Sequence, residues 1–248
     1  MLWHPFTTNY THFLLDILSG YLYLKNNLAK DLCAKLTLPV HTDLPRWQSE
    51  LLSHINLGCT RTNIDSLLPA PGYLQCICPS SVFIPIINHK GNAFTLLRQW
   101  IDSFRSLHTI DKCTNQVILS TRRDYRANRI KNLPEIEAYV QSINGSIIDP
   151  SRLNFADKIS AFANASYVIG ESAGALNGAL FAKDECKIIN LLDPRILSRR
   201  DFVNGGLIYH LGYAYKSTYI IGQDPTLLKG SPLASCVFPI ELIQSSIA

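Results

Sequence analysis

The chain has 248 residues, of which 47% are hydrophobic and 17% charged, and its formal net charge at pH 7 is +4. That length suits one large or two small domains, and the hydrophobic fraction excludes general disorder. The mild charge does not indicate a protein that coats nucleic acid, so we expect any bound anion to be small and expect no nucleic acid among the partners.

The seven cysteines are scattered along the chain without a CxxC pair. A structural zinc site needs four closely placed ligands, and Cys76 and Cys78 lack a second pair at a suitable spacing. We therefore predict free thiols in a reducing cytosol, with no metal and no cofactor. The N-terminus lacks the pattern of a signal peptide, and no apolar run is long enough to span a bilayer. We expect a cytoplasmic protein whose membrane contact is at most peripheral.

The first half of the chain is predicted to be mainly helical. Hydrophobic residues recur at helical spacing between residues 9 and 24. They are Phe13, Leu14, Ile17, Leu18, Tyr21 and Leu22. Further predicted elements are a helix over 47–55, a strand over 73–78, a helix over 93–107 and a linker over 109–115.

After this linker, strands and helices alternate. The predicted strands cover residues 116–121, 146–149, 167–170, 187–192 and about 218–222. A helix is predicted over 133–142. Another helix is predicted to begin after Asn154, whose side chain can accept a hydrogen bond from the N–H of the N3 residue Asp157. Small residues fill the segment 173–181. This alternation indicates right-handed βαβ units and a parallel, Rossmann-like sheet, with its ligand at the carboxyl ends of the strands.

The segment from Asn9 to Asp16 contains a candidate general base. On a helix, His12 and Asp16 are one turn apart on the face opposite the apolar stripe. A carboxylate there can orient an imidazole and raise its basicity. An ordinary surface pair has the same spacing, and spacing alone favours that interpretation.

A basic cluster follows the first strand of the second half, at Arg122, Arg123, Arg126, Arg129 and Lys131. Guanidinium groups match phosphate oxygens in geometry, and strand ends are where such a ligand binds. The alternative is a solvated charged face.

A glycine-rich turn covers residues 170–178, with the sequence GESAGALNG. A strand that leads into such a turn and then a helix leaves backbone N–H groups free to bind an anion. The alternative is that Gly170, Gly174 and Gly178 allow close packing. The segment also matches the G-x-S-x-G nucleophile elbow, and a serine hydrolase would combine Ser172 with Asp193 and His210.

These segments, taken in order, resemble glycosyltransferase family 61, in particular a bacterial-type member. The family's N-terminal N-Y-x-H-F-L-x-D pattern is matched from Asn9 to Asp16. Its S-R…R-x-I-x-N stretch resembles Ser120, Arg122, Arg129, Ile130 and Asn132. Its later block resembles the segment from Leu153 to Phe181 through Phe162, Ala165, Gly170, Leu176 and Phe181.

The resemblance implies a GT-B-like α/β fold, with two Rossmann-like halves facing a cleft and an abbreviated N-terminal half. We expect an acceptor-side half over residues 1–112, a nucleotide-sugar-binding half over 113–228, and a tail over 229–248 that returns to the first half. It also implies an inverting, metal-independent transfer from a UDP-linked sugar to a glycan or polysaccharide.

The resemblance and the residue chemistry together assign roles to individual positions. We expect His12, supported by Asp16, to be the base, with Glu171 as the next candidate. The predicted donor-binding residues are Arg122, Arg129, Asn132, Gly170, Ser172, Ala173, Gly174, Asn177 and Asp193. Two alternatives stay open: a serine hydrolase, and a binding relative that has lost its activity.

Overall fold

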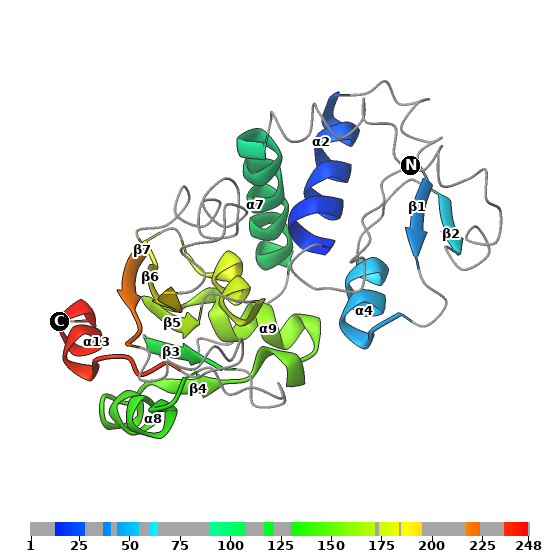
Figure 1. Ribbon diagram of the computed structural model, residues 1–248. Helices are drawn as coiled ribbons and strands as arrows, with labels where there is room; N and C mark the ends of the chain where they lie inside the picture. Colours follow the sequence, from blue (N-terminus) through cyan, green and yellow to red (C-terminus); the bar gives the residue numbers. More distant parts are fainter. Residues whose placement is uncertain are drawn as a thin grey trace, which may run out of the picture. The chain divides into compact units, whose positions relative to one another are not determined.

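The computed structural model describes residues 13–27, 37–40, 44–54, 60–63, 90–107, 117–121, 130–171, 174–183, 185–194, 217–223 and 236–247. The chain divides into two compact units, Met1–Ser106 and Leu107–Ala248 (Figure 1). The predicted strand at 73–78 and the predicted linker at 109–115 lie outside the described residues.

The N-terminal unit contains helices and a small sheet. Its described elements are a π-helical turn, η1 (Phe13–Leu18), the helices α2 (Ser19–Asn27), α4 (Arg46–His54) and α7 (Lys90–Leu107), and the parallel strands β1 (Thr37–Val40) and β2 (Thr60–Asn63). The first predicted helix therefore begins as a π turn and continues as α2. Its stripe is buried at Phe13, Leu14, Leu18 and Tyr21, as predicted. The ring of Phe13 meets that of Trp47 edge-on, with centroids 5.7 Å apart.

The C-terminal unit is built on a parallel five-stranded sheet with the order β4-β3-β5-β6-β7. The strands are β3 (Val117–Ser120), β4 (Ser146–Ile148), β5 (Tyr167–Glu171), β6 (Lys187–Leu192) and β7 (Ser217–Ile221). All five lie where the sequence predicts them. The sheet is consistent with a Rossmann-like α/β fold, and its order is that of a doubly wound sheet.

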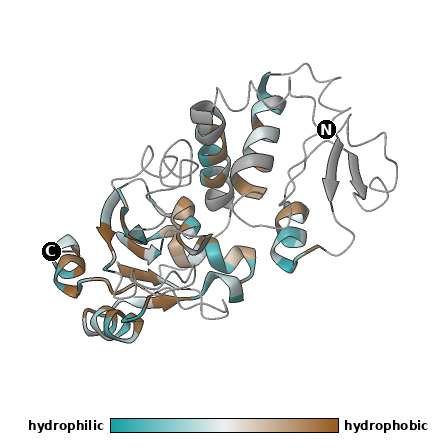
Figure 2. Cartoon of the chain, viewed as in Figure 1, coloured by the Kyte–Doolittle hydropathy of each residue, from teal (hydrophilic) through white to brown (hydrophobic). Residues whose placement is uncertain are grey.

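Helices cover both faces of this sheet. On one face, α8 (Leu133–Ser142) and α13 (Ile240–Ile247) pack against alternate strand residues (Figure 1). The buried side chains there are Val117, Leu119, Ile169, Ile189, Leu191 and Ile220 from the strands, with Ile136, Val140 and Ile243 from the helices. Figure 2 shows hydrophobic and hydrophilic residues alternating around these helices, as expected of helices with one buried face.

The opposite face is covered by α9 (Phe155–Ala163) and the 3₁₀ helix η4 (Gly174–Phe181). The helix α9 begins as predicted, because Asn154 Oδ1 accepts a hydrogen bond from the Asp157 N–H at 2.8 Å. A Cβ on Gly178 would lie 2.3 Å from the Phe162 ring, so glycine allows η4 to pack directly on α9. The segment predicted as a helix after the glycine-rich turn is a 3₁₀ helix, and its two glycines weaken the α-helical preference.

The C-terminal tail packs on the C-terminal unit. The strand-like residue Cys236 forms a parallel bridge with Ile130, and Val237 forms an antiparallel bridge with Gln223. The contacts that the structure describes for this tail lie within its own unit, and its expected return to the N-terminal half stays a prediction. Among the helices that the structure describes, none has both the length and the apolar character that a bilayer crossing requires.

Candidate functional site

The sheet has a topological switch point between β3 and β5. The chain passes from β3 to β4 on one side and then returns to the other side of β3 to form β5. The connections that leave β3 and β5 therefore run over opposite faces, with α8 after β3 and η4 after β5. In open α/β sheets, ligands bind outside the carboxyl ends of the strands at such a point.

The sheet becomes polar at this edge. Ser120, Gly170 and Asn190 are neighbours in register on β3, β5 and β6, and Ser120 and Asn190 are buried. The row immediately before it is Leu119, Ile169 and Ile189, which is apolar throughout. Because buried polar groups carry a desolvation cost, this change marks the carboxyl edge as more than a packing surface.

Polar residues also follow the strands at the same edge. Thr121 comes directly after β3 and is buried, while Glu171 ends β5 and Asp193 follows β6, both half-buried. The strands are parallel, so all three residues belong to one edge of the sheet. The structure thus brings together Gly170, Glu171 and Asp193, which the sequence predicted as site residues.

The glycine-rich turn is described in part. A Cβ on Gly170 would lie 3.1 Å from Leu176 Cδ1 and 3.1 Å from the Ser120 carbonyl oxygen, so η4 approaches β5 closely. Asn177 is fully buried within η4. Close packing thus explains why glycine occupies positions 170 and 178, which is one of the two interpretations made from the sequence. Ser172, Ala173 and the side chain of Ala175 lie outside the described residues. Anion binding by the turn therefore stays a prediction.

Asn132 has its amide directed to the tail. Its Nδ2 donates to the Phe238 carbonyl oxygen at 2.8 Å and to Glu135 Oε2 at 3.1 Å, and its Oδ1 accepts from the Phe238 N–H at 3.0 Å. Next to it, the Lys131 N–H donates to the Cys236 carbonyl oxygen at 2.8 Å. In this arrangement Asn132 joins the start of α8 to the tail, and its predicted contact with a donor stays a prediction.

Like Ser172 and Ala173, the predicted residues His12, Arg122 and Arg129 lie outside the described part of the chain. The backbone of Asp16 belongs to the π turn η1, which follows His12 directly. π turns within helices are frequent at functional sites. The unusual backbone therefore coincides with the segment that carries the candidate base.

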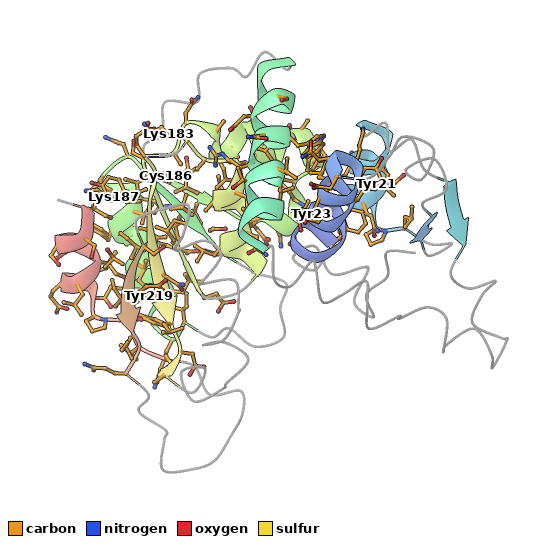
Figure 3. All side chains as sticks on the ribbon, turned by 90° about the horizontal axis from the view of Figure 1, so that it is seen from above. Tyr21, Tyr23, Lys183, Cys186, Lys187 and Tyr219 are labelled. Atoms are coloured by element: carbon orange, nitrogen blue, oxygen red, sulfur yellow. The ribbon has the colours of Figure 1, made fainter. Side chains whose placement is uncertain are left out.

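Tyr219, on the neighbouring strand β7, is the register partner of Asn190, so it extends the row of Ser120, Gly170 and Asn190 to the edge of the sheet. Partial burial raises the pKa of its hydroxyl above 10.0, and a side-chain hydrogen bond with Ser217 acts in the opposite direction. Lys187 belongs to the opposite, amino edge, where its Nζ lies 5.3 Å from the Tyr167 ring centroid. Figure 3 shows Tyr219 well away from Lys187.

Sequence reasoning missed two residues of this edge as site candidates, Thr121 and Asn190. Asn190 is a polar residue within the buried part of β6, and Thr121 follows Ser120 directly after β3. A polar residue inside a buried parallel strand is the signal that could have identified them. Among the residues that the structure describes, no group of three or more His, Cys, Asp or Glu side chains is placed to hold a metal ion.

The family described as Glycosyltransferase 61 matches residues 10–189, which include the π turn and the strands β3, β4 and β5 with the turn after β5. No curated protein matches the chain significantly.

Proposed function

Because the chain belongs to glycosyltransferase family 61, we propose that it transfers a sugar from a UDP-linked donor to a hydroxyl of a glycan or polysaccharide acceptor. We further propose inversion at the anomeric carbon, no requirement for a metal ion, a GT-B arrangement of the two units and a cytoplasmic location. The observation that carries the proposal is the polar row of Ser120, Gly170 and Asn190 at the switch point, where doubly wound sheets bind nucleotides.

The donor diphosphate would be held by the segments that follow β3 and β5. Arg122 and Arg129 follow β3 in sequence, and guanidinium groups form paired hydrogen bonds with phosphate oxygens. The turn of Ser172, Ala173 and Gly174 would add backbone N–H donors at the start of η4. Together they would stabilise the negative charge that develops on the leaving diphosphate.

The acceptor hydroxyl would be activated by a base in the N-terminal unit. His12, oriented by Asp16, would take the hydroxyl proton as the oxygen attacks the anomeric carbon. The bond from that carbon to the phosphate oxygen breaks, and UDP leaves with the electron pair. Such a base contributes about 10²–10⁴-fold to the rate. Glu171, at the carboxyl end of β5, is the second candidate.

The family match does not support the alternative of a serine hydrolase built from Ser172, Asp193 and His210. Ser172 and His210 also lie outside the described residues. A family member that binds a nucleotide sugar without turnover is the alternative that an activity assay addresses directly.

The decisive experiment measures UDP binding by calorimetry and transfer from a panel of UDP-sugars by mass spectrometry of the acceptor. We expect Arg129→Ala to weaken UDP binding by about 1.5–3 kcal/mol, the range for hydrogen bonds to charged groups. Arg129→Lys should restore it only in part, because an ammonium cannot form the paired bonds. Absence of UDP binding to the unaltered protein would refute the proposal.

A second measurement separates the base from a structural residue. His12→Ala should lower kcat strongly and leave UDP affinity unchanged, because proton transfer contributes only in the transition state. If Glu171→Gln has this effect and His12→Ala does not, the base is Glu171.

A further inference from the structure

Thr121 carries a buried hydroxyl that forms no hydrogen bond with the described residues. The side chain is 3% exposed, and its backbone N–H donates to the Ile148 carbonyl oxygen at 2.8 Å. Its Oγ1 is fully buried and has no hydrogen-bond partner among the residues that the structure describes. Because nearly all buried polar atoms in proteins are hydrogen-bonded, this exception requires an explanation.

Packing does not supply that explanation. Valine has the same branched shape as threonine and would fill the same volume without burying a hydroxyl. Ser120, the preceding residue, also has a buried side chain, and the residue makes further interactions in the structure. Among the buried hydroxyl oxygens of the described residues, that of Thr121 is the one without a hydrogen-bond partner.

The position of Thr121 indicates what the hydroxyl binds. It is the first residue after β3, next to the Ser120–Gly170 pair that forms the switch point. The strand β3 is the first strand of this doubly wound sheet, and in such sheets the turn after the first strand receives the phosphates of a nucleotide. In the sequence, two arginines follow it directly.

We propose that the Thr121 hydroxyl donates a hydrogen bond to a diphosphate oxygen of the nucleotide-sugar donor. This inference rests on the proposed function and adds a binding residue to it. A hydroxyl can act in this way without bringing a charge into a buried position, so its burial in the free protein is tolerated. The donor then provides a partner that the described residues do not provide.

Isosteric substitution tests this proposal in the full-length protein, with UDP as the probe. Thr121→Val should leave the melting temperature of the free protein unchanged or higher, because no hydrogen bond is lost. It should raise the Kd for UDP about 10- to 100-fold, as expected for a hydrogen bond to a charged group. Thr121→Ser keeps the hydroxyl and should bind UDP within a few-fold of the unaltered protein. Uridine, which has no phosphate, should bind the Val variant and the unaltered protein equally weakly.

Thr218→Val is the matched control, because Thr218 is an exposed residue of β7, at the edge of the sheet. It removes the same group and should leave UDP affinity unchanged. A lower melting temperature in Thr121→Val would show that the hydroxyl serves the fold and would overturn the inference. Unchanged UDP affinity in Thr121→Val would also overturn the inference about Thr121. In that case the proposed function still stands, provided that the unaltered protein binds UDP. If the unaltered protein does not bind UDP, the proposed function fails first and the inference fails with it.

Discussion

Replacing Asn132 should detach the C-terminal tail. In Asn132→Ala the N–H and the carbonyl oxygen of Phe238 both lose their partner in a part-buried site. The group that solvent cannot reach costs about 1–3 kcal/mol, and the bond that solvent replaces loses a net contribution of about 1 kcal/mol, so we expect a total of about 2–4 kcal/mol. The exposed bond to Glu135 adds little.

Asn132→Asp should not restore the tail, although aspartate has the same shape. The new carboxylate can still accept from the Phe238 N–H, but it places an oxygen against the Phe238 carbonyl oxygen and next to the Glu135 carboxylate. Its protonated form is the one that the fold favours, so its pKa is raised. The stability of this variant should therefore be highest below about pH 4 and fall as the pH rises through the folded-state pKa.

Amide hydrogen exchange measured by mass spectrometry is the suitable assay, because it reads the opening of residues 236–247 separately from the rest of the chain. A cost of 2–4 kcal/mol corresponds to exchange about 30- to 1,000-fold faster in that peptide. Asn164→Ala, at an exposed position after α9, is the control and should leave exchange in the tail unchanged. Tail exchange at the original rate in Asn132→Ala, or full protection in Asn132→Asp at neutral pH, would refute the reasoning.

Three further predictions concern packing, desolvation and pH. Gly178→Ala should lower the free energy of unfolding by about 1–3 kcal/mol, since its Cβ would overlap the Phe162 ring, and a smaller cost in a Phe162→Leu background would identify that contact as the cause. Gln48→Met should raise the free energy of unfolding by about 1–3 kcal/mol, because both polar atoms of this buried amide have no hydrogen-bond partner among the described residues; destabilisation in urea would contradict this. Stability should hold up to the ordinary pKa of tyrosine and fall as the pH rises through the raised pKa of Tyr219; in Tyr219→Phe this part of the alkaline loss should vanish, and the tyrosinate absorbance should show one late-titrating group fewer.

Local sequence patterns predicted the C-terminal unit well. Strands β3, β5 and β6 contain short buried apolar runs, so their positions are visible without the structure. The cap of α9 is equally local, because Asn154 and Asp157 are three residues apart. These features depend on neighbours in sequence, and the structure confirms them.

Features that depend on distant residues could not be predicted in the same way. The partner of Asn132 is Phe238, 106 residues later, and the motif that contains Asn132 suggested a ligand instead. The close approach of η4 to α9 depends on the Phe162 ring that faces Gly178. The unused hydroxyl of Thr121 is visible only once burial and hydrogen bonds are known. Periodicity carries no information about any of these.

Described contacts flank residues 122–129 on both sides and bear on the predictions above. Before this segment the Thr121 N–H donates to the Ile148 carbonyl oxygen, and after it Ile130 bridges to Cys236. The first contact belongs to the sheet and the second to the tail. Asn132→Ala should consequently alter the tail before it alters the sheet, and Thr121→Val should alter neither.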